Sequence, residues 1–419
     1  MITKTDKLLK KLIALHPKYI DLSLTRLEIL LKKLGNPHHQ LPPTIHIAGT
    51  NGKGSTLSFI KNILEQNSYS IHTYTSPHLE KFRERISINN KIVNANKLLR
   101  CLENVKKINN NNPITFFEIT TAAAFVLFAQ HKADFLILET GLGGRLDATN
   151  IIPKKMISII TAIDIDHQEF LGNTIKKITN EKLGIIRENE NVVIAKQKNE
   201  VQKYIFKKLK NKKNIYYFNK DYKFKPIQRN KFNYKFGNYK KIFSNPSLEG
   251  KHQIENASTA ITTAMILKKN NYFIRLNSLA KSILSTKWPG RIEKIVFKNK
   301  FIIFDGSHNL SGAVKLNDYL ITNKIRPVTI FGMLNNKDVK GFLSKLKKNI
   351  DTLYPIQIPD EINALNKKEI FDIANKLNIK SLLKPNLKTI NASIMKTPNK
   401  YILITGSLYL IGKIRKNYL

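Results

Sequence analysis

The feature that most constrains the fold is a glycine-rich segment, residues 49–56, which lies between an apolar run and an amphipathic pattern. Residues 44–48 are largely apolar and β-branched, which predicts a buried strand. After the glycines, Leu57, Ile60 and Leu64 recur at helical spacing. The N–H groups of such a turn and the positive end of the helix that follows both attract phosphate groups. The order of strand, glycine turn and helix therefore predicts a nucleotide-binding loop in an α/β fold.

The loop departs in one respect from the standard phosphate-loop pattern. That pattern places Ser or Thr directly after the lysine, whereas here Gly54 separates Lys53 from Ser55. The alternative interpretation is a tight strand-to-helix turn with an incidental lysine. In a nucleotide loop, Lys53 contributes a full charge, and Ser55 or Thr56 offers a hydroxyl group to Mg²⁺. We predict that ATP contacts these loop residues: Thr50, Asn51, Gly52, Lys53, Gly54, Ser55 and Thr56.

Length and composition limit the class of protein. A chain of 419 residues suggests two or three domains. The single cysteine, Cys101, excludes a disulfide framework and a cysteine-based metal site. No apolar run reaches the roughly 18–20 residues of a membrane span, and the first residues lack the apolar core of a signal peptide. We expect a cytoplasmic protein with no membrane partner.

The formal net charge of +41 suggests nucleic-acid binding as an alternative function. The lysines, however, are spread along the whole chain and are not gathered in a basic-aromatic module. We interpret them as a solvated surface and expect no nucleic-acid partner. A nucleic-acid binder would also have no need of the carboxylate and histidine that follow two of the predicted strands.

Polar residues follow three further strand-like runs. Ser76 comes after the run 70–74, Glu139 directly follows the run 135–138, and His167 comes after the run 157–163. Because ligands gather at the carboxyl ends of strands in α/β sheets, we expect these residues near the phosphate loop. A carboxylate such as Glu139 is a suitable Mg²⁺ ligand there. The alternatives are an ordinary Ser-Pro turn, a salt-bridged glutamate and a structural histidine.

The C-terminal part reads as strands alternating with helices. Short apolar runs at 301–304, 328–332 and 401–405 alternate with helical patterns, which implies a parallel sheet. Between the two parts, residues 287–290 (Lys-Trp-Pro-Gly) mark a break in composition. Alternating aromatic residues near residue 234 suggest short strands or hairpins.

Several motifs, taken together, resemble those of one enzyme family. Gly-Thr-Asn-Gly-Lys-Gly-Ser at 49–55, Ser-Pro-His-Leu at 76–79 and Glu-Thr-Gly-Leu-Gly-Gly-Arg-Leu-Asp-Ala-Thr-Asn at 139–150 occur in the family's order. They are similar to motifs of the folylpolyglutamate synthases and dihydrofolate synthases of the Mur-ligase superfamily, and the resemblance extends over nearly the whole chain. It implies an N-terminal phosphate-loop ATPase domain of the Mur-ligase type, residues 1–287, and a smaller Rossmann-like α/β domain, residues 288–419.

The resemblance also implies a set of site residues. Lys53, His167 and Lys182 match catalytic positions, and Lys182 matches a lysine that Mur-type ligases carbamylate; read from the residues alone, it is a surface lysine on a helix. The implied Mg²⁺ ligands are Ser55, Ser76, Glu139 and His167. The further implied ATP contacts are Asn256, Arg291 and Asp305. The residues implied to border the folate or pteroate are Phe116, Phe117, Glu118, Leu146, Asp147 and Ala148.

The function that the resemblance implies is ATP-dependent amide formation. Such an enzyme joins L-glutamate to 7,8-dihydropteroate and to tetrahydrofolates through an acyl phosphate, with Mg²⁺, and acts as a monomer. A folylpolyglutamate synthase without the dihydrofolate synthase activity is the closest alternative. Another Mur-type amide ligase is a more distant one, because the Ser-Pro-His-Leu motif points to folate.

Overall fold

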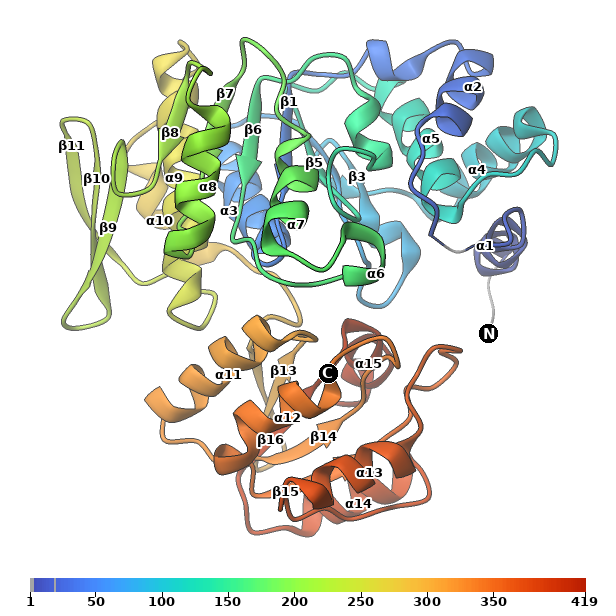
Figure 1. Ribbon diagram of the computed structural model, residues 1–419, viewed down its shortest axis with the longest axis vertical. Coiled ribbons are helices and arrows are strands. Elements are labelled where there is room, and N and C mark those ends of the chain that lie inside the picture. Colours follow the sequence, from blue (N-terminus) through green and yellow to red (C-terminus); the bar gives the residue numbers. More distant parts are fainter. Residues whose placement is uncertain (1–3, 19) are drawn as a thin grey trace. The chain divides into compact units, whose positions relative to one another are not determined.

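The computed structural model describes residues 4–18 and 20–419, and its contacts divide the chain into two compact units (Figure 1). The first unit comprises the described part of residues 1–245 together with 255–286. The second comprises residues 246–254 and 287–419. The division into domains 1–287 and 288–419 stays a prediction, but the contacts add a segment to the second unit that the sequence did not indicate, Pro246–Ile254.

The first unit contains an eight-stranded sheet with the strand order β4-β3-β2-β5-β1-β6-β7-β8. Along this order the neighbouring strands from β2 through β5, β1, β6 and β7 to β8 all run parallel. Strand β3 pairs antiparallel with both β2 and β4. The strands are β1 (Thr44–Ala48), β2 (Ile71–Tyr74), β3 (Ile86–Ile88), β4 (Lys91–Ile92), β5 (Phe135–Glu139), β6 (Ile157–Ile160), β7 (Asn191–Ile194) and β8 (Ile215–Tyr217).

The central strands are buried along their whole length, which explains their continuous apolar runs. Every residue of β1, β2, β5 and β6 is buried, as expected for a parallel sheet covered on both faces. The predicted strands are confirmed, but β6 ends at Ile160, earlier than its apolar run suggested. The chain leaves the sheet there because the Ala162 carbonyl accepts hydrogen bonds from the N–H groups of Thr50 and Asn51, at 2.9 and 3.2 Å.

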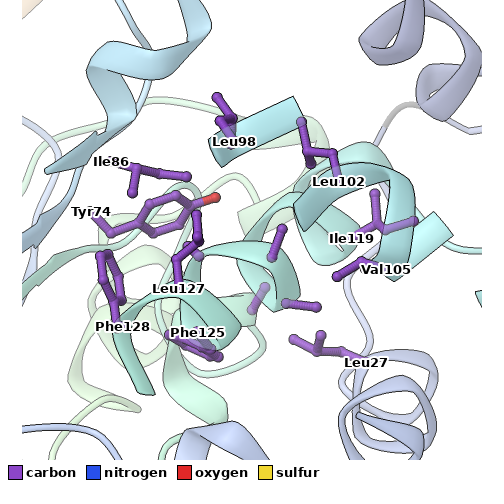
Figure 2. Packing of buried hydrophobic residues seen from close by; sticks show 14 of the residues in the cluster. Leu27, Tyr74, Ile86, Leu98, Leu102, Val105, Ile119, Phe125, Leu127 and Phe128 are labelled. Atoms are coloured by element: carbon purple, nitrogen blue, oxygen red, sulfur yellow. The ribbon is translucent and has the colours of Figure 1, made fainter. Parts of the chain in front are cut away.

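Helices cover this sheet and contribute to a large apolar cluster. Helix α5 is buried on nearly all sides and packs against α2, α4 and β3 (Figure 2). Figure 1 shows α1, α2, α4 and α5 together beside the β3 end of the sheet. The helices are α1 (Lys4–Ile13), α2 (Thr25–Lys33), α3 (Lys53–Glu65), α4 (Ala95–Asn109), α5 (Phe116–Ala129), α6 (Gln168–Leu171), α7 (Ile175–Leu183), α8 (Asn199–Leu209), α9 (His252–Lys269) and α10 (Ser278–Ser285).

A small antiparallel sheet accounts for the aromatic alternation near residue 234. Its order is β11-β10-β9, with strands β9 (Tyr222–Ile227), β10 (Lys231–Phe236) and β11 (Tyr239–Ser244). Phe232 and Tyr234 are buried, and the residues that alternate with them along β10, Lys231, Asn233 and Lys235, are exposed. The alternation therefore marks one buried face. The predicted hairpins are confirmed.

The second unit is built on a five-stranded sheet with the order β12-β13-β16-β14-β15. Only β12 runs antiparallel, so the predicted parallel sheet and the mixed α/β fold class are confirmed. The elements are β12 (Glu293–Phe297), β13 (Lys300–Asp305), α11 (Leu310–Thr322), β14 (Val328–Phe331), α12 (Val339–Leu346), β15 (Thr352–Pro355), α13 (Lys367–Lys376), α14 (Leu387–Lys396), β16 (Tyr401–Thr405) and α15 (Leu408–Ile414). In the described ranges, no helix has the length and apolar character needed to cross a membrane.

The cluster around α5 should dominate the stability of the first unit. Phe125 is fully buried in it, whereas Phe273 is 66% exposed. We expect Phe125→Ala to lower the free energy of unfolding by about 3–5 kcal/mol, because it leaves a cavity. The control Phe273→Ala should change it by no more than about 0.5 kcal/mol. Urea unfolding of both variants measures the difference, and equal losses would contradict this assignment of the core.

Candidate active site

The glycine-rich loop joins β1 directly to α3, and two of its glycines have backbone conformations that other residues rarely adopt. Gly49 has φ +154° and Gly52 has φ +92°. Helix α3 begins at Lys53, and within the described chain no side chain caps it. The first N–H groups of a helix lack intrahelical partners, so this uncapped end is suited to bind an anion.

Neighbouring side chains press closely on the same glycines. A Cβ atom at Gly52 would lie 2.5 Å from Oδ1 of Asn256, so Asn256 of α9 lies directly against the phosphate loop. A Cβ atom at Gly49 would lie 1.9 Å from Oγ1 of Thr161. Farther along α3, Thr56 is fully buried, and its hydroxyl has no hydrogen-bond partner among the described residues. The loop thus brings Asn256 together with the predicted ATP contacts 50–56.

Two lysines meet at one carbonyl of this loop. The ammonium groups of Lys53 and Lys182 each donate a hydrogen bond to the Gly49 carbonyl oxygen at 3.1 Å. Lys182 is only 4% exposed. Burial, reinforced by the charge of Lys53, lowers the pKa of Lys182 to about 7, although Asp166, Asp147 and Glu181 oppose this shift. The interpretation of Lys182 as a surface lysine is therefore wrong, because its side chain is buried.

The ends of β2 and β5 place Ser76 beside Glu139. Glu139 is the last residue of β5 and is only 5% exposed. Its Oε2 accepts a hydrogen bond from the Ser76 N–H at 3.3 Å. The next residue, Thr140, donates its N–H to the Ile47 carbonyl of β1 at 3.0 Å, so this carboxylate lies at the edge where the phosphate-loop strand also ends.

The segment after β6 carries His167 and is fastened to the phosphate loop. The Thr50 hydroxyl donates to the Asp164 carbonyl at 2.9 Å and accepts from the Asp164 N–H at 3.0 Å. His167 itself has φ +50°, and its N–H donates to Asp166 Oδ1 at 2.9 Å. Positive φ is uncommon outside glycine, so the backbone is held in an unusual conformation at this position.

The residues predicted for the metal do not form an all-protein cage. In the part of the chain that the structure describes, no three His, Cys, Asp or Glu residues gather as they would around a fully ligated ion. The predicted set offers two hydroxyl groups, one carboxylate and one imidazole. This donor set suits Mg²⁺, which binds through few protein ligands and keeps positions for water and substrate phosphates.

The second glycine-rich loop, residues 141–147, packs without space against α7. A Cβ atom at Gly144 would lie 2.6 Å from the Glu181 carbonyl oxygen, and one at Gly184 would lie 2.4 Å from Cβ of Arg145. The Arg145 N–H donates to the same Glu181 oxygen at 2.7 Å. The loop that contains the predicted folate residues Leu146 and Asp147, and that Ala148 directly follows, is thereby fixed to the helix that carries Lys182.

Aromatic rings line the approach to this loop. The ring of Phe117 lies over Gly141, where a Cβ atom would approach its Cζ to 2.6 Å, and it stacks on Tyr74 at 5.9 Å. Phe116 packs edge-on against Phe82 at 5.7 Å. The buried Arg85 lies 5.2 and 5.9 Å from the ring centroids of Phe82 and Phe116. The sequence analysis did not select Arg85, because nothing in a local pattern reveals its contact with the Phe116 ring of α5.

Glu118 has a structural role that its motif did not indicate. Its carboxylate accepts hydrogen bonds from the N–H and hydroxyl groups of Thr115, at 2.7 and 2.6 Å, and closes a capping box at the start of α5. The guanidinium of Arg26 pairs with it at 3.2 Å. These contacts occupy the carboxylate, and its part in substrate binding stays a prediction.

Arg291 and Asp305 lie together in the second unit. Asp305 ends β13 and accepts the N–H groups of Ile292 and Ser307, both at 3.1 Å. Burial raises the pKa of Asp305, and the charge of Arg291 opposes this. A Cβ atom at Gly306 would lie 3.0 Å from Nη1 of Arg291. The pair offers a cation beside a carboxylate at a strand end.

Comparisons with known proteins identify the family of this chain. Residues 47–264 match the Mur ligase middle domain, and residues 290–417 match the dihydrofolate synthetase C-terminal domain. The chain is 34% identical, over 94% of both chains, to the dihydrofolate synthase/folylpolyglutamate synthase of Bacillus subtilis. It belongs to the dihydrofolate synthase and folylpolyglutamate synthase family.

Solved structures of this family share the fold. FolC of Escherichia coli, in a complex with DHPP and ADP, superposes with a TM-score of 0.87 at 25% identity, covering 98% of this chain and 96% of FolC. The bifunctional enzyme of Yersinia pestis, complexed with AMPPNP and an Mn ion, gives a TM-score of 0.84 at 25% identity, with 98% of both chains covered. Family membership makes the chain an ATP-dependent ligase.

The buried Lys182 of this ligase should make its stability depend on pH. The pKa of Lys182 is about 7 in the folded state, against 10.5 ordinarily, so between these values the unfolded chain binds more protons. The free energy of unfolding should therefore rise with pH above 7, by up to about 1.4 kcal/mol per pH unit from this group.

Urea unfolding at pH 7 and pH 9 in carbonate-free buffer measures this contribution. Lys182→Met should remove it, so that the variant gains less stability than the natural chain as the pH rises. Lys176→Met, which changes an exposed lysine of the same helix, is the matched control and should leave the pH dependence as it is. Parallel pH profiles for all three proteins would contradict the burial of a neutral amine.

Proposed function

We propose that the chain is a bifunctional enzyme that joins L-glutamate to 7,8-dihydropteroate, making dihydrofolate, and to tetrahydrofolates, making polyglutamates. The observation that carries the proposal is the shared carbonyl of Gly49, where the phosphate-loop Lys53 meets the buried Lys182. A phosphate loop with a second, partly neutral lysine at its base suits a ligase that activates a carboxylate with ATP. The Bacillus subtilis relative, named for both activities, supports the bifunctional assignment.

The chemistry that this site can perform has two steps. A carboxylate oxygen of the pterin substrate attacks the γ-phosphorus of ATP, the bond to the β–γ bridging oxygen breaks, and ADP leaves. The glutamate amine then attacks the carbonyl carbon of the acyl phosphate, loses a proton and expels inorganic phosphate. Lys53 and the N–H groups at the start of α3 stabilise the charge of the transferring phosphoryl group.

ATP would lie along the loop 50–56, with Asn256 against Gly52. In the second unit, Arg291 and Asp305 are the proposed additional contacts, and the chain as a whole is proposed to act as a cytoplasmic monomer. Ser55, Ser76, Glu139 and His167 would hold Mg²⁺, which when bound neutralises part of the phosphate charge. The Mn ion bound with AMPPNP in the Yersinia pestis relative supports a divalent metal at this kind of site.

The folate or pteroate would lie between the aromatic pair Phe116 and Phe117 and the loop that carries Leu146, Asp147 and Ala148. Flat rings such as Phe117 can stack on a heterocycle. The DHPP bound in the Escherichia coli relative supports a pterin ligand in this family. Glu118 would act on this pocket through its fixed position at the start of α5.

We further propose that Lys182 is carbamylated. Its neutral amine would attack CO₂, form a nitrogen–carbon bond and release a proton, which leaves an anionic carbamate. Burial supports this reaction, because it keeps a large fraction of the amine unprotonated at pH 7. The anionic carbamate oxygens would then attract and orient Mg²⁺, whereas the ammonium form of Lys182 would repel it.

The decisive test is phosphate release from ATP with Mg²⁺ and L-glutamate, run in parallel with dihydropteroate and with tetrahydrofolate. Release with both establishes the bifunctional enzyme, and release with tetrahydrofolate alone reduces it to a folylpolyglutamate synthase. Lys53→Ala should lower kcat/KM by about 10²–10³-fold, since it removes the positive charge that stabilises the transferring phosphoryl group. Lys61→Ala, on the outer part of the same helix, is the control and should retain activity. No release with either substrate from a folded, ATP-binding protein would refute the proposal.

Carbamylation has its own test. Removing dissolved CO₂ should lower activity, and bicarbonate should restore it. Protein equilibrated with ¹³C-bicarbonate should give a carbamate signal by NMR that is absent in Lys182→Arg. Full activity without CO₂, together with no such signal, would show that the lysine acts unmodified.

A further inference from the structure

A chain of buried hydrogen bonds connects the centre of β1 to the loop 141–147. His46, in the middle of β1, is fully buried, and its Nε2 lies 2.8 Å from Oγ1 of Thr149. The Thr149 hydroxyl in turn donates to Oδ1 of Asp147. The other oxygen of Asp147, Oδ2, accepts the Leu142 N–H at 2.8 Å. The loop is thus closed by a carboxylate whose orientation depends on a histidine of the phosphate-loop strand.

The direction of these bonds fixes the form of His46. Because the Thr149 hydrogen is used on Asp147, Thr149 can only accept from His46, so Nε2 must carry a proton. Burial, together with the charges of Lys155 and Arg187, lowers the pKa of His46 well below its ordinary value, so the ring is neutral. His46 therefore acts as a single, fixed donor.

A purely structural role explains His46 poorly. Its neighbours in the same strand, Ile45 and Ile47, are apolar, and Nδ1 of His46 is buried without a hydrogen-bond partner among the described residues. An unpaired buried acceptor destabilises the fold, and a leucine at this position would avoid that cost. The histidine is thus a local disadvantage that a role in the site would offset.

We propose that His46 is a positioning residue for the folate-facing loop, acting through Thr149 and Asp147. This inference rests on the proposed function, in which Leu146, Asp147 and Ala148 border the pterin substrate. No contact of His46 with ATP or with the substrate is involved.

The effect should be confined to the folate side of the site. Other hydrogen bonds connect the loop to the end of α7. The side chain of Asn150 donates to the carbonyl of Arg145 in the loop at 3.0 Å and to the carbonyl of Gly184, which follows α7, at 3.1 Å. These bonds do not pass through His46, so breaking the His46–Thr149 bond should loosen the Asp147 side without displacing Lys182. Affinity for ATP should accordingly remain.

Two pairs of variants separate the hydrogen bond from the shape of the side chains. Thr149→Val and His46→Leu remove the bond, whereas Thr149→Ser and His46→Gln retain a hydroxyl and a donor. We expect the first pair to raise KM for dihydropteroate about tenfold, with the Kd for ATP, measured without folate, within about twofold of the natural chain. The second pair should restore KM substantially. The double variant His46→Leu/Thr149→Val should be no worse than the worse single variant, because both remove one interaction.

His72 supplies a matched control. It is equally buried in β2, which β5 separates from β1, and its Nε2 bonds the His131 carbonyl at 2.9 Å, away from the loop. His72→Leu should lower Tm but leave KM for dihydropteroate unchanged. Equal effects of His46→Leu and His72→Leu on KM, or equal losses of ATP and folate affinity in His46→Leu, would overturn the proposal.

A second measurement is independent of activity. Amide hydrogen exchange of residues 141–147 should be faster in Thr149→Val than in Thr149→Ser at the same overall stability. If the natural chain shows no turnover but exchange in this loop still follows the hydroxyl, the assigned function fails and the positioning network stands. If turnover is normal and neither exchange nor KM responds to the variants, the network has no positioning role.

Discussion

The active site depends on an electrostatic conflict at the Gly49 carbonyl. Two ammonium groups share this acceptor, one of them almost completely buried, and like charges at such a distance repel. The fold relieves the conflict by depressing the pKa of Lys182 and by placing Asp166, Asp147 and Glu181 around it. Lys182 thereby connects α7 to the phosphate loop, and the loop 141–147 packs against α7. The result is a buried lysine with a lowered pKa next to the start of α3.

The parallel sheet explains why these parts meet. The strands β2, β5, β1 and β6 end at one edge, and each delivers one functional segment there: Ser76, Glu139, the phosphate loop and the segment with His167. Backbone hydrogen bonds then join neighbouring segments, as between the Thr50 N–H and the Ala162 carbonyl. The site is therefore held mainly by main-chain geometry, and the side chains are carried on rigid supports.

Much of this could be predicted from sequence, because the signals were local. A run of β-branched residues ending in glycines has few structural solutions, and the positions of Lys53 after the glycine turn and of Glu139 at a strand end followed from pattern alone. What could not be predicted depends on contacts between distant segments. The carboxylate of Glu118 is held by Arg26, Arg85 lies between rings of two elements, and Lys182 looks like any helical lysine until the loop of Gly144 is packed against it. Sequence spacing carries no information about such contacts.

The close packing at Gly144 and Gly184 has a consequence for how this sequence can change. The chain has accumulated lysine on its surface, where almost any residue is accepted, but at these two positions even one added methyl group would collide with the opposite backbone or with Arg145. Such a collision would push α7 away from the loop and with it the amine of Lys182. The two glycines thus set the distance between the loop 141–147 and α7. Substitutions elsewhere in the chain are compatible with the position of Lys182 only if they keep that distance.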